Sequence, residues 1–525
     1  MSPLSPKSVF VPLVSIVAIA FGQLACSLVP GRTPSPTPSA PATVVPATAS
    51  SAPSVDLGPT KQAAGPENAP SLPNRPLSDS GPWYAFMVFT AAHELWAMNA
   101  DGSGLTMLWS YTDQDKDTTS EYFILSPAPS GARLAILQYD KYLQTAPVLR
   151  ILDLPSGSMQ MIANLLPSEV EYESLEGDAQ SAADQVWAAV GALNNLAWSP
   201  DARWLAFNAA IDGPSADVYV YDTSTERIEW LTDGPNQSTD LAWSPDGSYV
   251  VHNVVDTLYY RFSGIGYGML GAWAAVLDTG KPAIHLYDHA FIGFEHILGW
   301  LDDSRYLGDS FDGDSLGNCG HFNLRTVSME DGEGPVLFAG NYSWRAFDPT
   351  SKTMVLVLSS VLTDFDCNTS LDPGVYLFDL DTRETRLVPG IDPEPVLSAT
   401  WSAEAGLFFL GGGEELIAID PDGNVQRYPS IENLFDEPPI VAPGGDRWVL
   451  TNMMDGVLAV GTRAGELTGI ESERTRTSFW NLDGTWLFFF DDGVRLTAAP
   501  APDFEPLIVI QEGLPRAESP VLVNP

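Results

Sequence analysis

The stretch Leu196-Ala197-Trp198-Ser199-Pro200-Asp201-Ala202-Arg203-Trp204-Leu205-Ala206-Phe207 returns, slightly changed, as Leu241-Ala242-Trp243-Ser244-Pro245-Asp246-Gly247-Ser248-Tyr249-Val250-Val251-His252. In both copies a short apolar strand enters a Ser-Pro-Asp turn and leaves as a second apolar strand. A repeat with a period of about 45 residues is typical of a solenoid, a propeller or an array. The repeat therefore decides the architecture, although it does not name a ligand.

The same unit recurs in weaker form along most of the 525 residues, with further copies near residues 126, 300, 344, 401, 441 and 480. Each unit continues with a third strand that ends in an Asp turn, as in residues 218–223, and with a fourth strand, as in residues 227–232. Asp and Gly tolerate turn conformations, and aromatic and β-branched residues suit a half-buried sheet. Four short strands per unit indicate the blade of a β-propeller.

The first unit, residues 83–109, contains three strands instead of four. The C-terminal segment, residues 519–524, can supply the missing innermost strand, and this would leave no unpaired sheet edge. We therefore predict an all-β fold: a single β-propeller of four-stranded blades over residues 81–525, closed by the C-terminal strand, with eight or nine blades.

An apolar strand, Ser-Pro-Asp-Gly and a second apolar strand together resemble the WD40-like or TolB-like (PD40-type) propeller repeat. The resemblance is close at the units starting at Leu196 and Leu241 and looser at six others. The Gly-His and Trp-Asp dipeptides of eukaryotic WD40 repeats are absent at the corresponding places, so the bacterial form matches better. The resemblance implies a domain that binds partners and catalyses nothing.

The charge balance is strongly acidic, with 25 Lys and Arg against 67 Asp and Glu and a formal net charge of −42. Binding to nucleic acid requires Lys and Arg, so the composition argues against a nucleic-acid partner and against direct adsorption to anionic lipid. We interpret the charge as favouring solubility in an extracytoplasmic setting, with attraction of cations or basic partners as the alternative.

Residues 1–26 resemble a bacterial lipoprotein signal peptide. Lys7 precedes a short apolar stretch, residues 9–21, and Gln23-Leu24-Ala25-Cys26 follows this stretch. The apolar stretch is too short to span a bilayer comfortably. The usual signal has Leu three residues before the cysteine, where this chain has Gln23. We predict lipid attachment at Cys26, with ordinary cleavage or an uncleaved anchor as the alternatives.

Residues 27–80 are rich in Pro, Ser, Thr and Ala and contain almost no aromatic residues. Such a segment buries too little apolar surface to fold, and its Pro content makes it semi-extended. We predict a disordered linker that holds an exported propeller at the outer face of the cell membrane or in the cell envelope. The membrane is contacted through the lipid anchor only.

The other two cysteines, Cys319 and Cys367, fall between the second and third strands of neighbouring units. Equivalent loops of adjacent blades leave the same face of a propeller, and an exported protein permits disulfides. We predict a Cys319–Cys367 disulfide. Two free thiols, or a metal site shared with His321, are the alternatives.

The long connections gather on one face of the predicted propeller. The strand 1–2 turns are tight, whereas five strand 2–3 and strand 4–1 connections are long: residues 110–121, 165–193, 257–271, 309–321 and 361–374. Binding residues concentrate on loops held by a rigid scaffold. We therefore predict that a protein, peptide or glycan binds this face. A partly helical insertion at residues 167–193 either caps the face or packs on its rim.

Two acidic clusters lie within these connections: Asp113, Asp115 and Asp117, and Asp309, Asp312 and Asp314. The alternating spacing suits a Ca²⁺ loop. However, the first cluster has Thr118 where such a loop needs Gly and Ile124 where it needs Glu. We interpret both clusters as solvated acidic loops, with weak Ca²⁺ sites as the alternative, and predict no other cofactor.

The residues suggest no recognisable catalytic motif; for example, His93-Glu94 begins a zinc-protease pattern but lacks the second His. We predict a binding module, and the alternative is a glycosidase or lyase that uses carboxylates in the central channel. One set of aromatic residues recurs at the same repeat position, and we interpret it as packing between blades: Trp198, Trp243, Trp300, Trp344, Trp401 and Trp480.

Overall fold

The computed structural model describes residues 71–525, except 90–92, 112–120, 141–145, 155, 167–185, 187, 194, 212–214, 262–263, 278–280, 289–292, 313–318, 365–366, 413–414, 430–437, 452–457, 471–474, 476, 492–493, 515–516 and 518–519. The propeller belongs to the unit that contains Leu72–Pro525, and the second unit is Val14–Ser71. The predicted signal peptide, Cys26 and most of the predicted linker lie outside the described residues.

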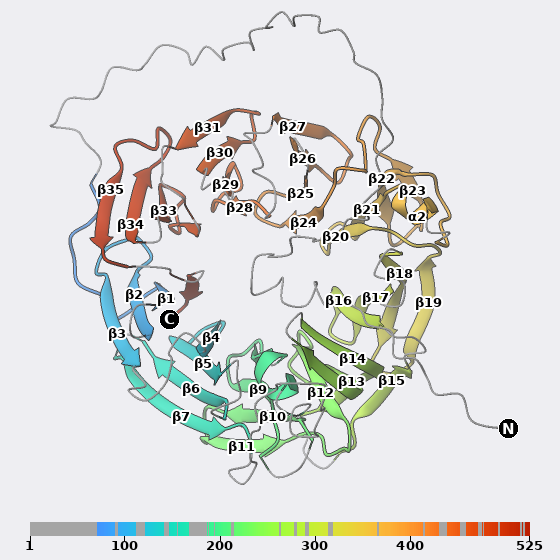
Figure 1. Cartoon of the computed structure of the whole chain (residues 1–525), viewed down its shortest axis with the longest axis horizontal. Coiled ribbons are helices and arrows are strands. Elements are labelled where there is room, and N and C mark those ends of the chain that lie inside the picture. The colour runs from blue at the N-terminus through green and yellow to red at the C-terminus, as the bar shows by residue number, and fades with distance from the viewer. Residues whose placement is uncertain are drawn as a thin grey trace, which may run out of the picture. The chain divides into compact units, whose positions relative to one another are not determined.

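Nine four-stranded antiparallel sheets form the propeller (Figure 1). The strands of each blade are given from the innermost strand outward. Blade 1 contains β36 (Val521–Val523), β1 (Trp83–Phe89), β2 (His93–Asn99) and β3 (Thr106–Tyr111). Blade 2 contains β4 (Glu121–Pro127), β5 (Arg133–Asp140), β6 (Val148–Asp153) and β7 (Ser158–Asn164). Blade 3 contains β8 (Ala197–Trp198), β9 (Trp204–Ala209), β10 (Asp217–Asp222) and β11 (Arg227–Trp230).

Blade 4 contains β12 (Gln237–Trp243), β13 (Tyr249–Arg261), β14 (Gly264–Val276) and β15 (Ile284–Asp288). Blade 5 contains β16 (Gly293–Asp302), β17 (Arg305–Asp312), β18 (His321–Ser328) and β19 (Gly332–Phe338). Blade 6 contains β20 (Trp344–Asp348), β21 (Thr353–Leu358), β22 (Gly374–Asp379) and β23 (Thr385–Leu387).

Blade 7 contains β24 (Ser398–Ser402), β25 (Leu407–Gly411), β26 (Glu415–Ile419) and β27 (Val425–Pro429). Blade 8 contains β28 (Ile440–Val441), β29 (Arg447–Thr451), β30 (Leu458–Thr462) and β31 (Leu467–Ile470). Blade 9 contains β32 (Ser478–Trp480), β33 (Trp486–Asp491), β34 (Arg495–Pro500) and β35 (Ile508–Glu512). The all-β propeller is confirmed, with nine blades.

The two ends of the propeller meet in blade 1. Strand β36 pairs antiparallel with β1, and Trp83 lies opposite Val523 in the register. The innermost strand of this blade therefore comes from the C-terminal segment, as predicted. The closure pairs the inner edge of β1, which would otherwise be open to another chain.

The repeated Ser-Pro-Asp sequence forms the turn between the first and second strands. In blade 4 the Ser244 hydroxyl donates to Asp246 at 2.6 Å and accepts from the Tyr249 amide at 3.0 Å, while the Ser248 amide donates to Asp246 at 3.0 Å. Gly247 has a φ of 73°, which glycine adopts without strain. Each turn thus satisfies its own polar groups, which explains why these residue types recur.

The repeated tryptophans join neighbouring blades. The Trp198, Trp243 and Trp480 indole nitrogens each donate to a backbone carbonyl on the innermost strand of the preceding blade, at Ser126, Ala197 and Ile440 respectively. All three side chains are buried. A buried indole needs a hydrogen-bond partner, and here that partner fixes one blade against the next. Packing between blades, as predicted for these residues, is confirmed.

The blades bury both faces of their middle strands against their neighbours. Strands β21 and β22 are buried almost throughout, and Val355 and Val357 of blade 6 share an apolar cluster with Phe408 and Leu410 of blade 7. Burial of each such side chain contributes about 1.5–3 kcal/mol. This double burial explains why the middle strands read as continuous apolar runs rather than as an alternating pattern.

Three predicted boundaries differ from the structure. Residues 257–271, expected as a loop, instead lengthen the β13–β14 hairpin, in which Tyr259 pairs with Gly266 and Tyr267 with Leu258. The predicted linker end is also part of the fold, since the Asn99 side chain donates to the Pro76 carbonyl and accepts from the Ser78 amide. The third difference, the position of Asp309, is described below.

Only short helical segments are found in the described part of the chain. The π-helix η4 (Ala188–Ala192) is the described part of the predicted helical insertion, and it contacts β5, β9, β12 and β13 of three consecutive blades. The second segment, α2 (Val361–Asp364), follows β21. Within the described ranges no helix has the length and apolar character needed to cross a membrane.

Candidate functional site

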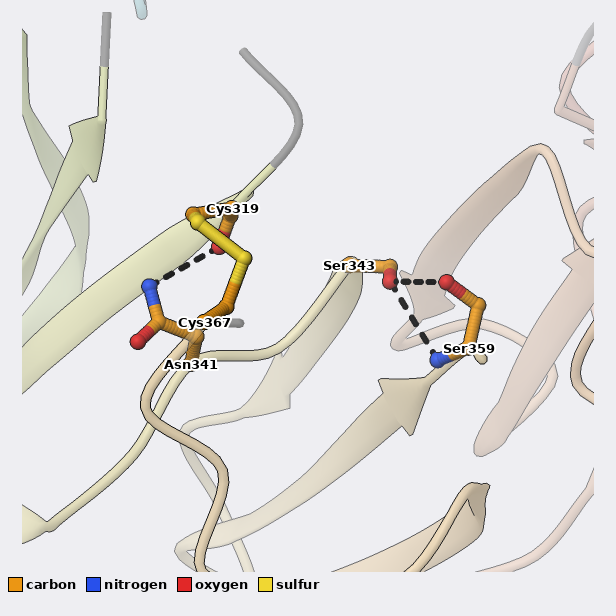
Figure 2. Close-up of a disulfide and its surroundings, with 5 residues drawn as sticks. All are labelled: Cys319, Asn341, Ser343, Ser359 and Cys367. Atoms are coloured by element: carbon orange, nitrogen blue, oxygen red, sulfur yellow. Dashed lines mark hydrogen bonds between the residues drawn. A yellow bond between two sulfur atoms is a disulfide. The ribbon is translucent and has the colours of Figure 1, made fainter. Parts of the chain in front are cut away.

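A disulfide joins two neighbouring blades on the face that bears the strand 2–3 connections. Cys319 precedes β18 of blade 5, Cys367 precedes β22 of blade 6, and their Cα atoms lie 5.5 Å apart. The Asn341 side-chain amide donates to the Cys319 carbonyl at 2.9 Å, and the Ser343 and Ser359 hydroxyls are 2.7 Å apart beside it (Figure 2). The covalent bond and the Asn341 contact join the two blades here, whereas the Ser343–Ser359 contact lies within blade 6.

Most residues of the two predicted acidic clusters lie outside the described ranges, so the weak Ca²⁺ sites stay predictions. Asp113, Asp115, Asp117 and Asp314 lie outside those residues, as does the side chain of Asp312. Asp309 was expected in a loop but lies within β17 and is completely buried. The fold surrounds this carboxylate with His296 and His321 of blade 5 and with Tyr342 and Arg345 at the start of blade 6.

Asp309 is the centre of a group that we name the Asp309 cluster: Asp240, His296, Asp309, His321, Tyr342 and Arg345. The Tyr342 hydroxyl donates to Asp309 Oδ2 at 2.8 Å, and Arg345 donates through Nε to Oδ2 and through Nη2 to Oδ1. His296 Nδ1 lies 3.2 Å from Oδ1, and His321 Nδ1 lies 3.5 Å from Oδ2.

The strands bring these residues together near the ends that adjoin the long connections. His296 and Asp309 lie opposite each other in the β16–β17 register, and His321 is the first residue of β18. Arg345 is the second residue of β20, just after the isolated bridge between His321 and Tyr342. The cluster therefore spans the first three strands of blade 5 and the innermost strand of blade 6, and it adjoins the disulfide.

The charges of the cluster are balanced inside the protein. Burial alone would raise the pKa of Asp309, but the Arg345 guanidinium and the two histidines overcome this and hold the pKa well below its usual range. Burial, and then the charge of Arg345, lower the pKa of His321 well below its usual value. At neutral pH the buried centre is thus an ionised Asp309 paired with Arg345, while His321 is uncharged.

Two side chains of the cluster remain partly exposed on innermost strands. The side chain of His296 is 22% exposed and that of Arg345 is 17% exposed. If His296 donates its Nδ1 proton to Asp309, its Nε2 is left as an acceptor, and Arg345 keeps guanidinium donors beyond those used by Asp309. The cluster can therefore offer both an acceptor and donors to a ligand.

Asp240 extends the cluster into blade 4. Its carboxylate accepts from the Thr239 hydroxyl at 2.9 Å and from the Asn253 side-chain amide at 3.1 Å. Burial raises the pKa of Asp240, and these hydrogen bonds and the charge of His296 offset only part of that effect. Asp240 and Asp309 thus have pKa values shifted in opposite directions on either side of His296.

His296, Asp309 and His321 have the ligand types and spacing of a metal site, since their ligand atoms all lie within 4.8 Å of one another. However, both Asp309 oxygens already accept from Arg345. A divalent cation would have to displace or repel the guanidinium. The arrangement therefore fits a charge-paired hydrogen-bond network better than a metal centre.

The expectation of no recognisable catalytic motif needs one correction at the level of sequence. Gly313-Asp314-Ser315-Leu316-Gly317 matches the pattern Gly-x-Ser-x-Gly of a hydrolase nucleophile. That motif acts on a sharp turn from a strand into a helix. Here it stands between strands β17 and β18, and its residues lie outside the described ranges.

Sequence reasoning missed the Asp309 cluster because its residues come from three blades. A weak signal was present, since charged residues at 309 and 345 interrupt stretches that otherwise read as buried strands. Charged residues are almost never fully buried unless they are paired. Such an interruption indicates a partner but does not identify it, because the partner depends on which blades become neighbours.

No family model matches the chain. A stretch of 182 residues, 34% of this chain, is 28% identical to the uncharacterized peptidase YuxL of Bacillus subtilis (strain 168), and it covers only 23% of that protein.

Two solved propeller structures are also similar. TolB from Acinetobacter baumannii is 15% identical, with a TM-score of 0.27, over 67% of this chain and 63% of TolB. Apo AztD from Citrobacter koseri is 11% identical, with a TM-score of 0.41, over 85% of this chain and all of AztD (100%). The class of protein, a nine-bladed β-propeller, rests on the blades themselves.

Proposed function

We propose that the protein is a membrane-tethered extracytoplasmic binding module, which takes a peptide or an extended protein segment at the Asp309 cluster. The observation that carries the proposal is the pair of partly exposed side chains, His296 and Arg345, on innermost strands above a fully buried Asp309. A rigid first layer of donors and acceptors, positioned by a buried second layer, is the usual construction of a recognition site.

The chemistry of the cluster favours a peptide over the other ligands considered. A peptide backbone alternates C=O acceptors and N–H donors, which match Arg345 and His296 respectively. The balanced charge of Asp309 and Arg345 gives no strong preference for an anion. The exposed indole on which a glycan would stack, Trp230, lies in blade 3 rather than in this cluster.

Panning a phage library of random linear peptides against the full chain tests the proposal. Selected peptides should bind His296→Ala at least tenfold more weakly, as should Arg345→Lys, which keeps the charge but loses the planar guanidinium. Arg305→Ala is the matched control, because Arg305 lies on β17 of the same blade at the opposite end, in an exposed ion pair with Asp302. Failure to enrich any peptide, or equal binding by all four proteins, would contradict the proposal.

The second candidate function is an enzyme, and the His296–Asp309 hydrogen bond favours it. A buried carboxylate that orients a partly exposed histidine is a common arrangement for general acid–base chemistry. The opposite pKa shifts of Asp240 and Asp309 add to this. A panel of chromogenic esters and glycosides would support an enzyme if turnover were lost in His296→Ala, and no turnover by wild type would exclude these classes.

A further inference from the structure

A cavity of about 830 Å³ lies between blades 3 and 4, apart from the Asp309 cluster. Blade 3 contributes Asp217, Trp230 and Thr232, and blade 4 contributes Ser238, His252 and Trp273. Sites for drug-sized ligands have volumes of about 300–1,000 Å³, with a largely apolar lining and a few polar groups. We name this feature the blade 3–4 cleft.

His252 is the most informative group in the cleft. Its side chain is only 2% exposed, yet neither ring nitrogen makes a well-formed hydrogen bond with any residue that the structure describes. A buried polar atom without a partner costs about 1–3 kcal/mol. Both ring nitrogens are shielded from solvent in the absence of a ligand, so a ligand in the cleft must shift the side chains around His252 to supply the missing hydrogen bonds.

The protonation state of His252 defines what that ligand must offer. Burial lowers the pKa of His252 to about 4, and the backbone of Asn253 offsets this only in part. At neutral pH the ring is therefore uncharged, with one N–H donor and one acceptor nitrogen. The matching ligand both donates and accepts hydrogen bonds, as a hydroxyl group does.

Two tryptophans give the cleft an apolar side. Trp230 ends β11 with 52% of its surface exposed, and Trp273 lies opposite His252 in the β13–β14 register. The Trp273 ring also contacts the His285 ring, with centroids 4.7 Å apart. Indole rings present broad, rigid faces, against which the C–H face of a sugar ring packs.

The remaining polar groups argue against a charged ligand. Asp217 is buried and already accepts from the hydroxyls of Ser215 and Thr232. Its carboxylate would repel an anion, whereas Lys281, which also lines the cleft, would repel a cation. A quaternary ammonium group would suit the indole rings but could not donate a hydrogen bond to His252.

We propose that the blade 3–4 cleft binds a neutral carbohydrate, with Trp230 and Trp273 against sugar rings and His252 hydrogen-bonded to a sugar hydroxyl. This site uses none of the residues of the Asp309 cluster, so it stands whether or not that cluster binds a peptide. It would give the protein a second ligand class.

An array of immobilised neutral oligosaccharides of glucose, galactose, mannose, xylose and N-acetylglucosamine, probed with the full chain, tests this inference. At least one class should bind, and titration calorimetry should show at least tenfold weaker binding for Trp230→Ala and His252→Leu. Leu387→Ala is the matched control, because Leu387 pairs with Tyr376 in blade 6 as Trp230 pairs with Tyr219 in blade 3 and is similarly exposed, at 53%.

A second readout separates a ligand site from a structural histidine. His252→Leu removes two buried polar atoms that lack well-formed hydrogen bonds, at similar volume, so the melting temperature without ligand should stay equal or rise. A clear fall would mean that His252 has a structural partner, and it would overturn the inference. Binding of no neutral glycan, binding only of choline or phosphate probes, or equal glycan binding by Trp230→Ala and wild type would overturn it as well.

Discussion

Removal of the Cys319–Cys367 disulfide should destabilise the propeller by an amount that the sequence separation sets. The bond closes a loop of 48 residues. In the chain-entropy treatment, a loop of this length restricts the unfolded chain by about 14 cal/mol/K, or about 4 kcal/mol at 25 °C. The double variant Cys319→Ala/Cys367→Ala loses this restriction while it keeps the hydrogen bond from Asn341 to the residue-319 carbonyl.

The corresponding shift in melting temperature is small because the domain is large. Unfolding entropy is about 2.1 cal/mol/K per residue near 60 °C, so roughly 450 residues that unfold together give about 1 kcal/mol/K. A loss of about 4 kcal/mol then lowers the midpoint by about 4 °C. Differential scanning calorimetry of wild type and the double variant measures this shift, and Cys26→Ser serves as the control for loss of a cysteine elsewhere.

Two results would refute this reasoning. The mass of unreduced wild type should be lower than that of the reduced protein by two hydrogen atoms, and equal masses would show that the bond does not form. A midpoint unchanged within about 1 °C, with the bond present in wild type, would show that the bond does not stabilise the protein by restricting the unfolded chain. Faster hydrogen exchange near β18 and β22 in the double variant would support the expected loosening.

Three further predictions concern charge and the tether. Arg345→Met should cost about 3–5 kcal/mol in urea unfolding, because it leaves Asp309 buried without its cation; a loss below about 1 kcal/mol would contradict the buried pair. The pKa of His252 is lowered to about 4 and that of Asp217 raised to about 6. As the pH falls from 6.5 to 4, the lowered pKa of His252 therefore decreases the free energy of unfolding, and the raised pKa of Asp217 increases it. Relative to wild type, His252→Leu should become more stable over that window and Asp217→Asn less stable, and parallel pH profiles would refute both assignments. Finally, wild type should carry a diacyl mass increment and associate with membranes, and Cys26→Ser should lose both. A soluble, unlipidated wild type would contradict the predicted tether.

The blade architecture was predictable because each blade encodes it locally. The Ser244–Asp246 turn closes with its own side chains, and Trp198, Trp243 and Trp480 donate hydrogen bonds to the preceding blade. The pattern can therefore be recognised from the sequence without knowledge of the ring. Closure by the C-terminal strand followed from a blade with one strand missing. The tight strand 1–2 turns and the pairing of neighbouring units likewise depend on residues that are close in sequence.

The candidate sites were not predictable in the same way, because they depend on contacts between blades. The sequence predicts a loop at Asp309, because the contacts of Asp309 with Tyr342 and Arg345 of blade 6 are formed only in the folded protein. From the sequence, His252 is one more strand residue at the end of a repeat. Only the structure shows that it lines a cleft beside blade 3. The type of a single residue indicates whether it is exposed or buried. The candidate sites depend instead on which buried residues the fold brings into contact.

The central claim is that the ligand contacts the Asp309 cluster, and a hydrogen-exchange footprint tests it most directly. Full-length protein should be compared with and without a selected peptide, over all exchangeable amides. We predict that the bound peptide slows amide hydrogen exchange in β16, in β20 and in the connections beside the disulfide, and that exchange at the Ser-Pro-Asp turns does not change. Protection confined to those turns on the opposite face, or spread evenly over the nine blades, would contradict it.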